Sequence, residues 1–295
     1  MRLQLPEREI EFPRRPLVMG IVNVNDDSFS GDGTLDFAAA LEQARSQARA
    51  GADVIDVGAE SARTNREAVS EAEEIRRFAG FLECWEDVWQ GVEPRDGAQV
   101  WPPILSANTW RPGVVKAVLR MGKVEIINDM GALPDDRNAR LCATHRSALL
   151  IMHSIGEPKI PHLHQQWPDV MGAMERFFEE KLSLATQAGL PEDAVLLDPG
   201  IDFAKQRDDN LTVYRDLARL QKFDRPVLVP VSRKTVIGEV LGLPDSRERD
   251  AGTIACIAAA MERGAQMFRV HDVDAAWQAV KVLHALACEP NHSDP

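Results

Sequence analysis

The chain has 295 residues, of which 44% are hydrophobic and 27% charged, and its net charge is −12 at pH 7. This length suits either one large α/β barrel or two average domains, with a sizeable core in both cases. The net charge argues against a broad surface for nucleic acid or for an anionic membrane, because both need clustered cations. A small anionic ligand held by a few local Lys and Arg side chains is compatible with it.

The N-terminal segment and the cysteines indicate a cytoplasmic protein. Residues 1–15 carry charges throughout and contain no apolar stretch of the signal-peptide kind. No run reaches the roughly 18 apolar residues that a membrane span needs. Reduced thiols are expected, because no C-x-x-C pair indicates a zinc site or a disulfide scaffold. The cysteines are Cys84, Cys142, Cys256 and Cys288.

Short apolar runs alternate with helical patterns along the chain. The lead-in, 1–15, is a candidate hairpin, and Ser70 with Glu73 forms a capping box at the start of a helix. Pro112 suits the first turn of another helix. Strands are expected at 16–24, 53–58, 104–109, 124–127, 148–152, 194–197, 226–231 and 266–270, and helices at 35–50, 70–89, from 112, 135–146, 168–189, 209–221, 246–263 and up to about 287.

Eight strands alternating with helices imply parallel strands joined by right-handed crossovers. One closed eight-stranded parallel (βα)8 TIM barrel fits this pattern, because such barrels typically have about 250 residues. An open doubly wound sheet is the alternative. No shift in composition marks a boundary, so we expect a single domain over 1–295, with a tail at 288–295.

The run 226–231 is the strongest single pointer to a functional site. Its apolar, largely β-branched residues end in Ser232, Arg233 and Lys234. Such a run predicts a strand that is buried on both faces. Lys234 would then follow the carboxyl end of a parallel strand, where α/β proteins bind ligands. For this stretch alone, a surface loop with two solvated cations is the simpler alternative.

Polar side chains recur at the ends of the other strands. In a barrel these ends meet at one mouth, so we expect a polar pocket there rather than a set of separate helix caps. Asp56 lies inside its strand, and a structural role is the alternative for it. The residues concerned are Asn23, Asp56, Arg63, Asn108, Asn128, Asp198, Lys234, Arg269 and His271.

Two kinds of chemistry are combined in this expected pocket. A carboxylate, Asp198, beside two amides, Asn108 and Asn128, matches a flat heterocycle with a guanidine-like edge. Asn23 with nearby carboxylates could hold a Mg²⁺ whose other ligands are water and phosphate oxygens. The positive side chains suit phosphate or pyrophosphate; they are Arg63, Arg269, His271 and, as a further candidate, Lys234.

These motifs resemble those of the dihydropteroate synthase family, which belongs to the pterin-binding barrels. The resemblance covers about 16–286, nearly the whole chain. It rests on six blocks in one order: MGIVNV…DSFS (19–30), GADVIDVGAES (51–61), IIND (126–129), LDPGIDF (197–203), VSRKTVIG (231–238) and FRVHDV (268–273).

The resemblance implies a reaction in folate biosynthesis and a cytoplasmic homodimer. The family is a group of transferases that join p-aminobenzoate to the methylene of 6-hydroxymethyl-7,8-dihydropterin diphosphate and release pyrophosphate. Lys234, Arg63 and Asp198 are the implied catalytic residues. The resemblance places Asn108, Asn128, Asp198 and Lys234 at the pterin, Asn23 on a Mg²⁺ at the diphosphate, Arg63, Arg269 and His271 at the leaving pyrophosphate, and Phe29, Ala62, Phe203, Lys234 and Thr235 around p-aminobenzoate.

Three departures from the family pattern make this a divergent member. Asn108 replaces the Asp of the family's S-V-D-T motif, and Ala62 replaces the Thr of its G-E-S-T-R-P loop, while the first loop differs over 25–32. Losing one charged hydrogen bond in a transition state costs about 2.7–4 kcal/mol. The departures leave a second hypothesis open: a pterin-binding protein with weak or no synthase activity or with a different second substrate.

Two further functions are less compatible with the motifs. A pterin-dependent methyltransferase would also hold a pterin with Asp and Asn side chains. The S-R-K and R-V-H-D motifs, at 232–234 and 269–272, suit a diphosphate leaving group and so favour the synthase. A barrel that binds an unrelated phosphorylated ligand would not need all six blocks.

Overall fold

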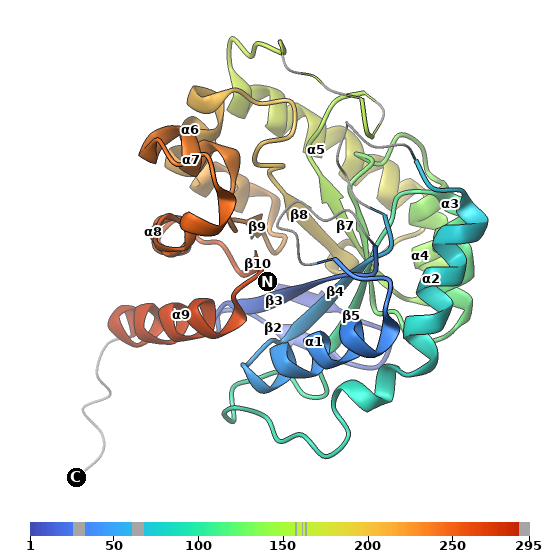
Figure 1. The fold of residues 1–295 in the computed structure, drawn as a ribbon. Coiled ribbons are helices and arrows are strands. Elements are labelled where there is room, and N and C mark those ends of the chain that lie inside the picture. Colours follow the sequence, from blue (N-terminus) through green and yellow to red (C-terminus); the bar gives the residue numbers. More distant parts are fainter. Residues whose placement is uncertain (26–32, 61–67, 157, 161, 163, 289–295) are drawn as a thin grey trace.

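Eight parallel strands form a barrel within a ring of helices in the computed structural model (Figure 1). The structure describes residues 1–25, 33–60, 68–156, 158–160, 162 and 164–288. The strand order is β8-β7-β6-β5-β4-β3-β10-β9, and a bridge between Leu197 and Val227 joins the two outer strands. The expected TIM barrel is therefore confirmed. Its strands are β3 (Leu17–Asn23), β4 (Val54–Gly58), β5 (Ile104–Asn108), β6 (Ile126–Asp129), β7 (Ala148–Met152), β8 (Val195–Asp198), β9 (Leu228–Pro230) and β10 (Met267–Val270).

The helices follow the sequence pattern with three corrections. The helix expected over 209–221 ends at Asp216, and a 3₁₀ helix, Leu217–Phe223, follows it. The helix expected over 70–89 ends at Glu83, and a short 3₁₀ helix, Trp85–Val88, follows it. Two helices rather than one follow β9, because the seven-residue α7 is too short to show helical periodicity. The α-helices are α1 (Phe37–Arg49), α2 (Glu71–Glu83), α3 (Pro112–Arg120), α4 (Arg137–His145), α5 (Val170–Gln187), α6 (Arg207–Asp216), α7 (Thr235–Leu241), α8 (Asp250–Met261) and α9 (Val273–Ala287), and the other 3₁₀ helices are Glu192–Ala194 and Ser246–Glu248.

The local helix signals explain where two of these helices begin. Pro112 occupies the first turn of α3, where its missing N–H costs no intrahelical bond. Ser70 caps α2 by accepting the N–H of Glu73 at 3.2 Å. The Glu73 carboxylate turns to Arg76 and Arg77, so this is a one-sided cap rather than the expected capping box.

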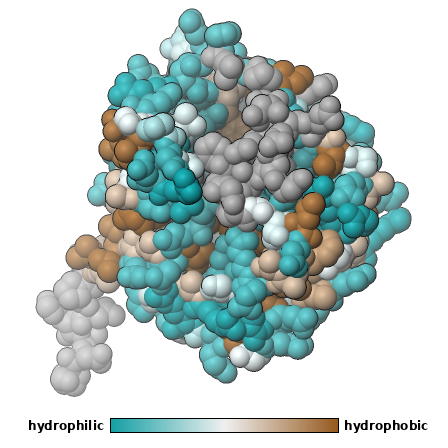
Figure 2. Space-filling model, viewed as in Figure 1, coloured by the Kyte–Doolittle hydropathy of each residue, from teal (hydrophilic) through white to brown (hydrophobic). Residues whose placement is uncertain are grey.

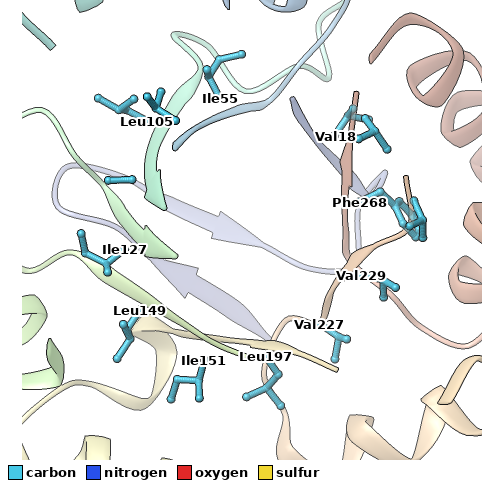
Figure 3. Packing of buried hydrophobic residues seen from close by; sticks show 14 of the residues in the cluster. Val18, Ile55, Leu105, Ile127, Leu149, Ile151, Leu197, Val227, Val229 and Phe268 are labelled. Atoms are coloured by element: carbon cyan, nitrogen blue, oxygen red, sulfur yellow. The ribbon is translucent and has the colours of Figure 1, made fainter. Parts of the chain in front are cut away.

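Side chains along each strand alternate between the outside and the inside of the barrel, so the core has two layers. Val18, Ile55 and Leu105 point outward, toward the helices, and belong to the larger apolar cluster. Figure 3 looks along the barrel and shows this outward set. The residues between them point into the barrel, because successive strand side chains face opposite sides. The inward positions thus decide what the barrel interior and its mouth are made of.

The lead-in closes one end of the barrel. Strands β1 (Arg2–Gln4) and β2 (Glu9–Glu11) form an antiparallel hairpin, which confirms the candidate hairpin. Its buried residues Leu3 and Ile10 pack against inward side chains near the strand starts, such as Leu196. The hairpin is visible behind the strands in Figure 3. A ligand can therefore enter the barrel only from the opposite end, where the strands finish.

The outer surface is mostly polar (Figure 2). Large apolar side chains are exposed on the helices at the C-terminal side of the barrel, and brown atoms gather there on the left of the view. Val240 and Leu241 lie on α7, and Val282 and Leu286 lie on α9. Within the described part of the chain, none of the helices combines the length and the apolar character that a membrane crossing requires.

Candidate active site

A pocket of about 260 Å³ opens at the carboxyl ends of the strands. Nine of the residues predicted for the site line it together, from β3, β5, β6, β8 and β10, from the segments that follow β8, β9 and β10, and from the start of α7. Phe29, Ala62 and Arg63 lie outside the described residues. The lining residues are Ile21, Asn23, Gly58, Glu60, Asn108, Asn128, Met130, Met152, Asp198, Asp202, Phe203, Pro230, Ser232, Lys234, Thr235, Arg269 and His271.

Strand register brings the polar side chains together. Gly58 of β4 lies beside Asn108 of β5, and Asn108 lies beside Asn128 of β6. All three are inward positions, since their strand neighbours such as Ala107 and Ile127 belong to the outer apolar cluster. The small Gly58 leaves room beside the two amides. The floor of the pocket is therefore a direct product of the period-two pattern.

The buried carboxylate of Asp56 organises this floor. It accepts hydrogen bonds from Ser106 Oγ at 2.5 Å, Arg269 Nε at 2.7 Å, Asn128 Nδ2 at 3.1 Å and Asn108 Nδ2 at 3.4 Å. A buried charge needs such partners, because burial without them is costly. Both amides point their nitrogens at Asp56, so their oxygens lie on the side away from it. A ligand meeting those oxygens must offer hydrogen-bond donors.

Asp198, at the end of β8, is a second buried carboxylate in the pocket. Its Oδ1 accepts the N–H of Gly200 at 2.7 Å. Burial raises the pKa of Asp198 to about 6, against the opposing effects of the Gly200 bond and of Lys234, Lys205 and Arg269. A carboxylate with this pKa is ionised at neutral pH and can accept two bonds from a guanidine-like edge.

Lys234 follows β9 and reaches over the pocket. Its Nζ donates to the carbonyl of Ile201 at 2.9 Å and lies 5.2 Å from the centre of the Phe203 ring. Burial lowers the pKa of Lys234, and the charges of Asp202 and Asp198 work in the opposite direction. Lys234 is thus held against the loop after β8 by a carbonyl and an aromatic face.

The other cation of the same stretch has a structural role. Arg233 donates from Nε and Nη2 to the Asp250 carboxylate, at 2.8 and 3.0 Å, and so ties the loop to α8. Ser232 lies next to it and lines the pocket. Its hydroxyl lies 2.8 Å from Nδ1 of His271 and accepts the backbone N–H of the same residue. The serine therefore fixes the histidine ring at the pocket wall.

Lys205 is a buried lysine that no sequence motif singles out. Its Nζ donates to the carbonyls of His153, Gly200 and Phe203 at 3.0 to 3.2 Å. Burial lowers the pKa of Lys205 to about 7, with Asp198 opposing the shift. Through these bonds the lysine fixes the loop after β8, and with it the positions of Asp198 and Phe203.

The donor set near Asn23 can be tested against Mg²⁺. Asn23 ends β3 and lines the pocket, and Glu60 is the carboxylate on its side of the mouth. Glu60 is already paired with Arg111 at 2.7 Å and with Lys159 at 3.0 Å. Among the described residues there is also no cluster of three His, Cys, Asp or Glu side chains. One amide oxygen is enough for a Mg²⁺ whose other ligands are mostly water and phosphate oxygens. It is not enough for a site in which the protein supplies all the ligands.

The sequence carries a signal for some of the remaining residues in and around the pocket and none for others. Asp56 lies two positions before Gly58, so strict alternation alone places it on the inward face. Glu60 belongs to one of the six blocks, although the sequence reasoning assigned it no role. Asp202 bonds a backbone N–H 33 residues away, and one of the carbonyls that Lys205 bonds is 52 residues away; no sequence pattern predicts such contacts.

The chain matches the family described as pterin binding enzyme over residues 19–271. It is 34% identical to the dihydropteroate synthase of Synechocystis over 278 residues, which are 94% of this chain and 92% of the relative. The Yersinia pestis dihydropteroate synthase, solved with a sulfonamide drug complex, superposes with a TM-score of 0.86 at 31% identity, over 97% of this chain and 99% of that one.

Two structures of the Thermus thermophilus dihydropteroate synthase are also similar to this chain. One is described as a complex with 4-aminobenzoate and superposes with a TM-score of 0.80, and the other is described as a complex with 6HMPPP and has a TM-score of 0.77. Each is 30% identical and covers 97% of this chain and 100% of the Thermus chain.

Proposed function

The chain belongs to the dihydropteroate synthases of the pterin-binding enzyme family, and from this premise we propose how its pocket works as a transferase. It joins 6-hydroxymethyl-7,8-dihydropterin diphosphate to p-aminobenzoate and releases pyrophosphate. The observation that carries the assignment of roles is the convergence of Asn108, Asn128, Asp198 and Lys234 in one pocket. The Thermus complexes with 4-aminobenzoate and 6HMPPP support the two substrates.

The floor of the pocket binds the pterin ring. Asp198 accepts the two N–H groups of the guanidine-like edge, in the manner of a carboxylate facing a fork of donors. The oxygens of Asn108 and Asn128 accept further ring N–H groups, since their nitrogens are used by Asp56. Lys234 donates to the ring from the other side. The ring is thereby held with its methylene toward the mouth.

The reaction is a displacement at that methylene carbon. The amine nitrogen of p-aminobenzoate attacks the carbon, and the C–O bond to the diphosphate breaks. The electron pair leaves with pyrophosphate, and the nitrogen then loses one proton. Arg269 and His271 stabilise the charge that develops on the leaving group, as does Arg63. Their positions on the pocket wall support this role for Arg269 and His271.

Mg²⁺ is the proposed cofactor, and Asn23 would hold it. A bound Mg²⁺ would neutralise charge on the diphosphate oxygens. The second substrate fits beside Phe203, Lys234 and Thr235, which form the outer wall of the pocket. Phe29 and Ala62, which the resemblance assigns to the same substrate, lie outside the described residues.

A direct assay tests the reaction. Protein, dihydropterin diphosphate, Mg²⁺ and p-aminobenzoate are incubated, and dihydropteroate and pyrophosphate are measured. Equal amounts of both products are expected, with strong loss in Lys234→Met and little change in Lys222→Met, an exposed lysine paired with Glu175 and Glu179. Tight binding of the pterin diphosphate without product would favour a pterin-binding protein, the hypothesis that Asn108 motivates. Neither binding nor product would count against the pterin site.

We also propose a homodimer in the cytoplasm. The exposed apolar side chains Val240, Leu241, Val282 and Leu286 support an interface on α7 and α9. The four cysteines are unpaired, which supports a reducing compartment. Sedimentation of the wild-type chain should give twice the monomer mass. Val282→Glu should yield monomers, and a monomeric wild type would reject the dimer.

A further inference from the structure

The turn after β8, residues 200–204, has an unusual backbone. Three of its five residues have positive φ angles: Gly200 at 64°, Asp202 at 68° and Ala204 at 51°. Non-glycine residues held in this region cost free energy, and such strain persists only where the surrounding structure holds it. A Cβ atom on Gly200 would lie 2.0 Å from the carbonyl oxygen of His153, so the turn lies directly against the end of β7. A turn of this kind needs bonds from outside it to keep its conformation.

Lys205 supplies three of these bonds. Its Nζ donates to the carbonyls of Gly200 and Phe203 within the turn and to the carbonyl of His153 beside it, at 3.0 to 3.2 Å. An ammonium group has three N–H donors, so the three bonds together use the charged form in full. The residue is 7% exposed, and within the described part of the chain none of its hydrogen-bond partners is a carboxylate. Its positive charge therefore acts on groups that it does not touch.

The same turn contacts two residues of the pocket. The N–H of Gly200 donates to Asp198 Oδ1 at 2.7 Å, and the carbonyl of Ile201 accepts from Lys234 Nζ at 2.9 Å. Lys205 thus fixes the backbone that meets both the carboxylate and the ammonium group proposed to bind the pterin. Without its bonds the turn could relax, and both side chains would lose their direction.

Lys205 also acts on Asp198 through its charge. A carboxylate accepts the guanidine-like edge of a pterin best as the anion. Burial works against that anion and raises the pKa of Asp198 to about 6, whereas the charge of Lys205 opposes the rise. Burial lowers the pKa of Lys205 to about 7, so the lysine stays protonated as the pH falls through 6.

The other charged groups around this pair come from several elements. His153 is neutral at these pH values, because burial lowers its pKa to about 2. The charges that act on Asp198 or Lys205 besides their own are those of Lys234 before α7, Arg269 on β10, Asp209 on α6 and Asp202 in the turn.

We propose that Lys205 is a positioning residue of the pterin site, whose ammonium group holds the turn 200–204 against Asp198 and Lys234 and whose charge keeps Asp198 anionic. The proposal deepens the proposed function and rests on it, because the ligand concerned is the pterin of that reaction. Lys205 is not among the residues that line the pocket. It acts on the ligand through Asp198 and Lys234 and takes no part in the bond changes.

Three variants separate the charge of Lys205 from its hydrogen bonds. Lys205→Arg keeps the charge and the donors, Lys205→Gln keeps two N–H donors without the charge, and Lys205→Met keeps neither. Lys123→Met is the matched control, because it removes a partly buried positive charge that precedes β6 and is paired with Glu86 at 2.7 Å. Urea denaturation shows that each variant is folded before it is compared.

Two quantities are measured on each folded variant. The pKa of Asp198 is measured in the free protein from the carbon NMR signal of its carboxyl group, which Asp198→Asn identifies. The affinity for 6-hydroxymethyl-7,8-dihydropterin, which lacks the diphosphate and does not react, is measured by calorimetry over a range of pH. Formation of dihydropteroate from the dihydropterin diphosphate is assayed separately.

The pKa of Asp198 is expected to rise from about 6 to about 7 in Lys205→Gln and Lys205→Met, the change that one lost opposite charge produces. It should stay at the wild-type value in Lys205→Arg and Lys123→Met. Pterin affinity at pH 6 should then fall about fivefold in Lys205→Gln, because about a tenth of Asp198 remains ionised instead of half. Lys205→Met should lose more, because the turn also loses its donors.

An unchanged pKa of Asp198 in the neutral variants overturns the inference, even if dihydropteroate is formed normally. A pKa that rises equally in Lys205→Arg overturns it too, because altered packing would then be the cause. So does a pterin affinity that does not follow the pKa. If Lys205→Met does not fold, Lys205→Gln gives the same comparison with two of the bonds retained.

The synthase reaction can fail separately. A pKa and a pterin affinity that change as expected, in a protein that forms no dihydropteroate, support the role of Lys205 and overturn the reaction with p-aminobenzoate. The two failures are therefore distinguishable.

Discussion

The two ends of the barrel are each organised by a buried carboxylate, and the two residues lie close together in the chain. Asp53 precedes β4 and belongs to the closed end, whereas Asp56 lies within β4 and bonds residues that line the pocket. Asp53 accepts bonds from Arg15 at 3.0 and 3.2 Å and from the backbone N–H groups of Val18 and Val100, each at 2.9 Å.

The partners of the two carboxylates differ in kind. Around Asp53, two of the donors are backbone groups and the side chain is fully buried, so nothing is left for a ligand. Around Asp56, all four donors are side chains, and three of them, Asn108, Asn128 and Arg269, also line the pocket. A buried carboxylate thus stabilises the fold at one end and orients ligand-binding side chains at the other, because only the partners of Asp56 line the pocket.

The largest effect is expected from breaking the closed end. Asp53→Ala leaves the Arg15 guanidinium, whose side chain is 4% exposed, without its partner. Removing one member of a buried pair costs about 3–5 kcal/mol of unfolding free energy. Urea denaturation measures this loss. Asp193→Ala, which removes a partner of the exposed Arg2, should cost less than about 1 kcal/mol. A loss at Asp53 as small as that of the control would show that the two ends are not different in this way.

The corresponding change at the open end should act on activity. Asp56→Asn removes the charge that Arg269 and both amides bond, so the pterin acceptors lose their orientation. We expect kcat/KM to fall about 10²–10³-fold, the scale of one lost transition-state interaction. Pterin affinity should fall with it in a calorimetric titration. Activity within tenfold of the wild type would show that the pterin acceptors do not depend on the charge of Asp56 for their orientation.

The comparison also explains what the sequence could predict. Side chains on strands follow a period of two, so the amino-acid sequence alone is enough to place the floor residues Asn108, Asn128 and Asp198 at one mouth. The same rule places the closed-end apolar layer. For Asp56 the residue type leaves a structural role open as an alternative, although its position two residues before Gly58 fixes the face on which it lies.

The outer wall obeys no such rule. Lys205 bonds three carbonyls that are 52, 5 and 2 residues away along the chain, and Asp202 bonds N–H groups 33 and 34 residues away. Those contacts depend on loop conformations that periodicity does not encode. The helix α7 escapes prediction for a related reason, since seven residues give no measurable pattern. The fold and the pocket floor were therefore predictable, and the wall was not.

The pH dependence of pterin binding separates Asp198 from a carboxylate outside the pocket. The pKa of Asp198 is raised to about 6, so its ionised form, the proposed acceptor, is lost as the pH falls through 6. Binding should weaken about fivefold from pH 6 to pH 5 and about tenfold for each further unit, as the ionised fraction of a group with this pKa falls. Calorimetric titrations at several pH values measure this.

Asp129 is the matched control for that titration. Burial also raises the pKa of Asp129 to about 6, but its partners are Asn138 and the Gly131 N–H rather than pocket groups. Asp129→Asn should leave the pH profile of binding unchanged, whereas Asp198→Asn should flatten it. A pH profile of binding that survives in Asp198→Asn would reject the assignment.

The stability of the fold depends on pH in the opposite direction from binding. A carboxyl group whose pKa is raised in the folded state stabilises the fold below its unfolded pKa, and this contribution is lost as the pH rises through about 6.

The smallest effect is expected at Asn108, which replaces a family aspartate. Asn108→Asp adds a carboxylate near the pterin, and negative charge there stabilises a methylene that becomes positive in the transition state. We expect the synthase rate to rise a few-fold in a product assay. The new carboxylate would lie near Asp56, whose Oδ2 is 3.4 Å from the present amide nitrogen, so the unfolding free energy should fall by about 1 kcal/mol.

Asn138→Asp offers the matched control, because that amide donates to the buried Asp129 at 2.8 Å and does not line the pocket. Asn138→Asp should lose stability in the same way without any gain in rate. An unchanged or lower rate in Asn108→Asp would mean that the reaction in this pocket needs the amide of Asn108 and gains nothing from a carboxylate there.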